Sequence, residues 1–246
     1  MMTGCAALSP SRWLPVDDQT SRQVLETLRQ KEARISTLKG LFQISISGAG
    51  IPLSQDLNGI VSYRQPDQVH LRGFIRLGMP VLDFHREGNL YEIFFPAEGR
   101  RVSGEVNRVR QDSEWDQTVV LSLRALDAVL GKIPGLAQAE AQVLKDDHFY
   151  RIDQVVPPLD SSGSSADVLV RTRVDAQTLE VSSIEYYQPA DDLVVSVQCE
   201  DYRIVKNRES DGHPPVRLPF RIRAKDHRML GGSVTLAFRE FILNAA

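Results

Sequence analysis

The sequence predicts a mainly β protein of the α+β class, in which a single strongly curved antiparallel sheet forms an incomplete barrel and two helices cover its concave face. Three observations predict this fold: apolar residues alternate with polar ones from residue 41 onward, turn-forming residues separate short strand candidates, and two segments have helical spacing. The 246 residues are 42% hydrophobic, which is enough for one substantial core. A sheet of about a dozen strands must curl or close.

The first helix is predicted over residues 17–38, with Thr20 or Ser21 as its N-cap and Gly40 after its end. Apolar residues recur there at intervals of three, four and seven: Val24, Leu25, Leu28, Ile35 and Leu38. The second helix is predicted over residues 119–130, before Gly131 and Pro134. Its apolar positions are Leu121, Leu123, Leu126, Val129 and Leu130.

The strand candidates follow one another too closely for helical crossovers, so the pattern predicts a meander of hairpins. Turns such as Gln65-Pro66-Asp67 and Glu87-Gly88-Asn89 separate neighbouring candidates. The candidates span residues 41–47, 59–64, 68–77, 81–86, 89–95, 101–106, 139–144, 148–156, 167–174, 179–188, 193–205, 216–224 and 233–244. No internal repeat or domain boundary interrupts them. The prediction is a leader over residues 1–16 followed by a single domain over residues 17–246.

The chemically reactive residues form no pattern typical of an enzyme. The net charge of −3 provides no basic face for nucleic acid. His70 and His85 lack metal-ligand spacing along the chain and are predicted to be solvated. Asp146-Asp147-His148 lies before a strand, where aspartates commonly form turns. We therefore expect no catalytic residue, no metal ligand and no cofactor.

Apolar residues alternate along many strands and share one face of the predicted sheet. They either fill an ordinary core or line a cavity, because two helices are too few to cover so wide a sheet. The predicted cavity residues are Leu28, Phe42, Ile44, Ile46, Val69, Leu71, Ile75, Tyr91, Ile93, Phe95, Val195, Val197, Phe220 and Ile222.

Three stretches resemble the bacterial lipoprotein-localisation (LolA/LolB-like) family, and its LolB-like outer-membrane lipoproteins above all. They are GIVSYRQPDQVHLR at residues 59–72, IRLGMP at 75–80 and VLGKIPG at 129–135. The resemblance implies a half-barrel whose helices form a lid over an apolar cavity for acyl chains. It also implies that Leu77 and Met79 lie on a membrane-insertion loop. The family pattern has proline before leucine-glycine, whereas Pro80 follows Met79 here.

The run Thr3-Gly4-Cys5-Ala6 resembles a lipobox, the cleavage site at which bacterial lipoproteins are lipidated. Only four residues precede Cys5, so this interpretation implies a signal peptide that begins further upstream. A lipidated Cys5 would anchor the protein to a membrane. Ala6 in place of an aspartate favours the periplasmic face of the outer membrane, by the family's sorting logic. The alternatives are an ordinary terminal cysteine or a disulfide with Cys199, which otherwise fits a small core residue.

Two functional hypotheses follow. In the first, a monomer binds lipid acyl chains or acylated lipoproteins, received from a periplasmic LolA-like carrier, and transfers them without chemical reaction. In the second, a structural or assembly lipoprotein fills its own cavity and uses the half-barrel as a docking platform in the cell envelope.

Overall fold

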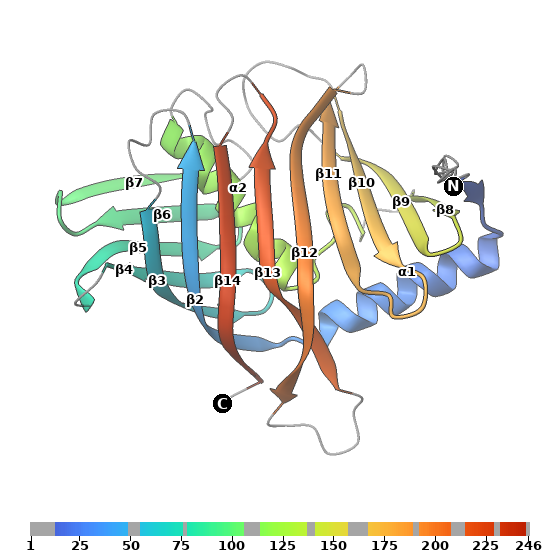
Figure 1. The fold of residues 1–246 in the computed structure, drawn as a ribbon, viewed down its shortest axis with the longest axis horizontal. Coiled ribbons are helices and arrows are strands. Elements are labelled where there is room, and N and C mark those ends of the chain that lie inside the picture. Colours follow the sequence, from blue (N-terminus) through green and yellow to red (C-terminus); the bar gives the residue numbers. More distant parts are fainter. Residues whose placement is uncertain are drawn as a thin grey trace, which may run out of the picture.

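The computed structural model describes residues 13–48, 55–75, 78–105, 114–136, 141–156, 167–188, 192–207, 215–228 and 232–244. Within them, 14 strands form one curved sheet that does not close (Figure 1). The strands are β1 (Leu14–Pro15), β2 (Thr37–Gly48), β3 (Gln55–Arg64), β4 (Gln68–Phe74), β5 (Pro80–Glu87), β6 (Leu90–Phe95), β7 (Arg100–Glu105), β8 (Ala141–Lys145), β9 (Phe149–Val156), β10 (Val168–Asp175), β11 (Val181–Gln188), β12 (Asp192–Asn207), β13 (Val216–Asp226) and β14 (Gly232–Leu243). The predicted fold class is confirmed.

The order across the sheet is β1-β8-β9-β10-β11-β12-β13-β14-β2-β3-β4-β5-β6-β7. All neighbours in this order pair antiparallel, and most are consecutive in the chain, as a meander requires. The last strand, β14, pairs with β2 and so joins a C-terminal half (β8–β14) to an N-terminal half (β2–β7). The short strand β1, which the sequence pattern did not predict, pairs with β8 at one edge.

Two helices, α1 (Asp18–Ala33) and α2 (Glu114–Val129), accompany the sheet. The first ends at Ala33, not at residue 38 as predicted. Ile35 and Leu38 are buried beyond its end, in the connection and at the start of β2, so the apolar spacing continued past the helix. The predicted N-caps were also wrong: Asp17 caps α1 and accepts hydrogen bonds from the backbone N–H groups of Gln19 and Thr20.

Most buried side chains of the sheet lie on one face, which we call the inner face. The second helix packs on this face against β12, β13 and β14, and Figure 1 shows it behind these strands, with α1 near β8 to β11. In the described part of the chain, neither helix is both long and apolar enough to cross a membrane. Cys199 is a buried free thiol on β12, in agreement with a core role, and burial raises its pKa to about 12.

A row of aromatic rings packs at the junction between the two halves of the sheet. The ring centroids of Phe238 and Phe241 are 4.3 Å apart, and that of Phe42 is 5.7 Å from Phe238. Phe42 lies directly over Gly59, where an added Cβ atom would be 2.3 Å from the ring. The glycine in β3 is therefore required by the close approach of Phe42.

Asn244 fixes the same junction through hydrogen bonds. Its buried side chain accepts from the backbone N–H groups of Ser36 and Thr37 at 3.0 and 3.2 Å, and from the Ser36 hydroxyl at 2.8 Å. Its amide donates to the carbonyl oxygen of Arg34 at 3.0 Å. The end of β14 is thus tied to the connection between α1 and β2.

We predict that Asn244→Ala lowers the free energy of unfolding by about 1–3 kcal/mol, because the partly buried backbone N–H groups of Ser36 and Thr37 lose their acceptor. Urea denaturation measures this change. Asn58→Ala, which removes an exposed amide with one bond to Arg239 at 3.3 Å, serves as the control. Equal, small losses for both variants would contradict this role for Asn244.

Candidate functional site

A small apolar cavity lies between α2 and the inner face of the N-terminal half. Every lining side chain except Ser122 is apolar, and the volume is about 70 Å³. The lining residues are Ile44, Ile46, Leu71, Leu82, Phe84, Ile93, Phe95, Ser122, Leu123, Leu126 and Leu236.

Strand alternation builds this lining. Leu82 and Phe84 of β5 face inward, as do Ile93 and Phe95 of β6. The helix contributes Leu123 and other residues one turn apart, which share a face at helical spacing. The cavity is therefore the gap that remains where one helix covers five strands.

The cavity is too small for a long acyl chain in the described conformation. An acyl chain needs several times this volume, so such a ligand requires more space between α2 and the sheet than the described conformation provides.

Charged side chains, which we call the anchor, tie the C-terminal end of α2 to the sheet. Arg86 of β5 contacts Asp127 at 3.2 Å and Asp67 at 3.7 Å, and Lys132 contacts Asp67 at 2.5 Å. Burial opposes the charge on Lys132, but its hydrogen bond to Asp67 and the charge of Asp127 raise its pKa above the ordinary value. The anchor lies where the start of β4 pairs with the end of β5, at residues 68 and 87.

The cavity lies toward the opposite end of the same strands. Its lining includes Leu82 near the start of β5 and Phe95 at the end of β6, and Ser122 precedes the anchor residue Asp127 along α2. Met79, in the loop between β4 and β5, lies at this end with 54% of its surface exposed. The helix is thus tied through Asp127 and covers the cavity with the turns directly before it, through Ser122, Leu123 and Leu126.

The inner face of the C-terminal half carries polar groups. Tyr186 is buried with the Arg124 guanidinium 5.2 Å from its ring centroid, and burial raises the pKa of Tyr186. The Thr172 hydroxyl and the Gln154 amide oxygen are buried with no hydrogen-bond partner among the described residues. This half is a less suitable surface for a purely apolar ligand than the N-terminal half.

A second hollow, of about 300 Å³, opens between α1, the end of α2, the turn between β10 and β11, and strands β11 to β13. Leu28 and Leu218 line it, while Lys31 and the Arg217–Glu180 ion pair, at 3.1 Å, contribute charge. Lys31 donates to the carbonyl oxygens of Thr178 and Leu179, and burial lowers its pKa. The mixed lining distinguishes this hollow from the apolar cavity.

The structure brings together part of the predicted cavity set. Ile44, Ile46, Leu71, Ile93 and Phe95 line the apolar cavity, and Leu28 lines the second hollow. Ile75 is partly buried against the core, and the remaining predicted residues are buried in the core: Phe42, Val69, Tyr91, Val195, Val197, Phe220 and Ile222. Cys5 and Leu77 lie outside the described residues.

Sequence reasoning missed Leu82 and Phe84 as lining residues. Both are apolar and two positions apart in a predicted strand, so the alternation of that strand could have identified them. The predicted turn at Asp146 is confirmed, because its carboxylate accepts from the backbone N–H groups of His148 and Phe149. His70 and His85, predicted to be solvated, are 34% and 56% exposed, and their rings lie together on the outer face, the face opposite the helices.

No protein-family model and no curated protein matches this sequence. Solved structures match the fold over most of the chain. A LolA superfamily protein of Nitrosomonas europaea has a TM-score of 0.54 at 14% identity, covering 90% of this chain and 94% of its own. An outer-membrane lipoprotein-sorting protein domain of Vibrio parahaemolyticus has a TM-score of 0.58 at 13% identity, covering 92% and 94%.

A DUF1329 family protein of Desulfovibrio piger is equally similar, with a TM-score of 0.56 at 14% identity and 95% of each chain covered. Identities this low establish a shared fold and leave function to be argued from the site. The resemblance of the sequence motifs and the arrangement of sheet and helices agree with these matches. The chain therefore has a LolA/LolB-like fold.

Proposed function

We propose that this protein binds acyl chains of lipids or lipoproteins between the sheet and α2, without catalysing a reaction. The observation that carries the proposal is the cavity lining, which is apolar throughout except for Ser122 and is covered by one helix. Burial of apolar surface contributes a free energy of ~25 cal/mol per Å². The buried surface of an acyl chain can therefore offset the apolar contacts that α2 loses when the cavity opens. The names of the Nitrosomonas and Vibrio neighbours support this ligand class.

The location that best fits this function is the periplasmic face of the outer membrane, to which a lipidated Cys5 would attach the protein. The Vibrio neighbour is described as an outer-membrane lipoprotein-sorting domain, which supports an envelope location. The exposed Met79 lies at the same end of the strands as the cavity, where a membrane-inserted loop would deliver an acyl chain. A periplasmic LolA-like carrier is the proposed donor of cargo.

The movement that admits a ligand is proposed to be a swing of α2 about its anchored end. The anchor holds the C-terminal end through Arg86, Asp127, Asp67 and Lys132, whereas the cavity lies under the preceding turns. Lid movements of this kind gate binding in many proteins.

A docking platform is the second candidate, because the described cavity holds only about 70 Å³. Native mass spectrometry of the protein extracted from membranes separates the two functions. If the protein binds acyl chains, phospholipid or acylated peptide is expected to co-purify with it. A protein that is always empty and retains a fixed protein partner would overturn it in favour of the platform.

We predict that Ser122→Leu weakens binding of a fluorescent palmitoyl probe about tenfold, because the new side chain fills the cavity from the helix. Leucine is a better helix former than serine, so the free energy of unfolding is expected to change by less than about 0.5 kcal/mol. Fluorescence titration and urea denaturation measure the two effects. Ser103→Leu, at an exposed position of β7, is the matched control. Unchanged probe affinity for Ser122→Leu would argue against this cavity as the site.

We predict the opposite pattern for Asp127→Asn in the anchor. The loss of its charged contact with Arg86 lowers the free energy of unfolding by about 1–3 kcal/mol. Probe affinity is expected to change less than about threefold. An interaction that is kept in both the open and the closed conformation does not shift the equilibrium between them. A large gain in affinity would show that the anchor breaks on opening and would refute the swing about this end.

A further inference from the structure

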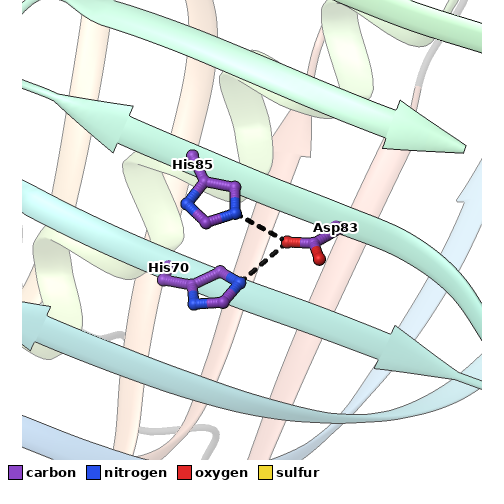
Figure 2. A group of neighbouring side chains, drawn as sticks. All are labelled: His70, Asp83 and His85. Carbon is purple, nitrogen blue, oxygen red and sulfur yellow. Dashed lines mark hydrogen bonds and ion pairs between the residues drawn. The ribbon is translucent and has the colours of Figure 1, made fainter.

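Two histidines and an aspartate from neighbouring strands converge on the outer face (Figure 2). The pairing of β4 with β5 places His70 opposite His85, and Asp83 lies two residues before His85 on the same face. The Nε2 atoms of His70 and His85 lie 2.7 and 3.0 Å from the same oxygen, Oδ1 of Asp83. The imidazole rings are stacked, with centroids 3.9 Å apart and 19° between their planes.

We propose that His70, Asp83 and His85 bind a divalent transition-metal ion of the Zn²⁺ type. Two imidazole nitrogens and one carboxylate oxygen form a donor set that Zn²⁺ accepts, with a fourth position left for water or an external donor. The three donor atoms all lie within 4.8 Å of one another.

The geometry requires only a small adjustment to hold the ion. Bonds of about 2.0–2.1 Å in a tetrahedral site place the donor atoms about 3.4 Å apart. Oδ1 of Asp83 now lies 2.7 and 3.0 Å from the two nitrogens, so it must withdraw by a few tenths of an ångström. Rotation of the side chain provides that shift without movement of the strands.

The surroundings orient the carboxylate of Asp83. Its other oxygen, Oδ2, accepts from Nε of Arg72 at 3.1 Å, which leaves Oδ1 directed at the histidines. Arg72 is half-exposed, so its positive charge is screened by water and opposes a bound cation only weakly.

The protonation of the histidines gives the proposal a spectroscopic signature. A carboxylate only accepts hydrogen bonds, so the hydrogen bond from His70 to Asp83 requires a proton on Nε2 of His70 when no metal is bound. Coordination through Nε2 moves that proton to Nδ1. The ¹⁵N shifts of His70 and His85 therefore report metal binding directly.

The site is independent of the acyl-chain cavity, which lies on the other face of the sheet. His70 and His85 border an outer hollow of about 970 Å³, so the fourth coordination position is reachable from solvent. Failure of acyl-chain binding would leave this inference untouched, and the reverse also holds.

The full chain is first stripped of metal with a chelator. It is then titrated with ZnCl₂, with binding followed by calorimetry, and with Co²⁺, with binding followed by visible absorption. We expect one ion per chain and a Co²⁺ spectrum typical of a nitrogen- and oxygen-coordinated site. His70→Ala and His85→Phe, the second of which keeps a stacked ring, are each expected to weaken Zn²⁺ binding at least about tenfold.

His227→Ala is the matched control, because His227 is an exposed histidine that contacts Ser196 on another strand. Its Zn²⁺ affinity is expected to equal that of the unaltered protein, and circular dichroism checks that all variants fold. Absence of Zn²⁺ binding by the unaltered chain, or Zn²⁺ binding by His70→Ala and His85→Phe as tight as that of the unaltered chain, would show that the three residues form only a hydrogen-bonded surface cluster. Unchanged histidine ¹⁵N shifts on Zn²⁺ addition would likewise overturn the proposal.

Discussion

The pairing of β14 with β2 is the interaction on which the rest of the structure depends. It joins the last strand of the chain to the first long one and turns two meanders into one continuous sheet. The aromatic row of Phe42, Phe238 and Phe241 packs across this seam, and Asn244 ties its end to the connection after α1. Without this pairing, Ile44 and Leu236 would not meet, and the cavity under α2 would lose one wall.

Because side chains alternate across a strand, the same strands carry two unrelated sites. On β5, Phe84 faces the apolar cavity, whereas Asp83 and His85 face outward. On β4, Leu71 faces inward and His70 outward. A one-residue slip of either strand would exchange the two faces, so the register that builds the cavity also assembles the histidine cluster.

Local patterns in the sequence predicted the elements well, because hairpin turns and period-two alternation are local properties. The end of α1 was misplaced because Ile35 and Leu38 are buried by the connection and by β2, in positions that continue helical spacing. The cavity was predicted too broadly for a different reason. Alternation identifies the inner face, but only the path of α2 decides whether a residue such as Val197 touches a cavity or the core.

The histidine cluster lay beyond sequence reasoning, since His70 and His85 are fifteen positions apart and meet only through strand register. Motif spacing along a chain detects ligands within one helix or loop, and a cross-strand set has no fixed spacing. The same limit applies to the anchor, where Asp67 and Lys132 come from distant segments.

The division of α2 into an anchored end and a covering end connects structure to the proposed function. Apolar contacts with Leu123 and Leu126 can be exchanged for contacts with an acyl chain at little net cost, because both are apolar. The charged contacts of Asp127 cannot be exchanged in this way, since an apolar ligand offers no partner for a carboxylate. A helix with both kinds of contact is therefore expected to separate from the sheet in the turns before Asp127, where its contacts are replaceable, and to stay bound at Asp127 itself. The cavity under those turns lies toward the same end of the strands as the exposed Met79.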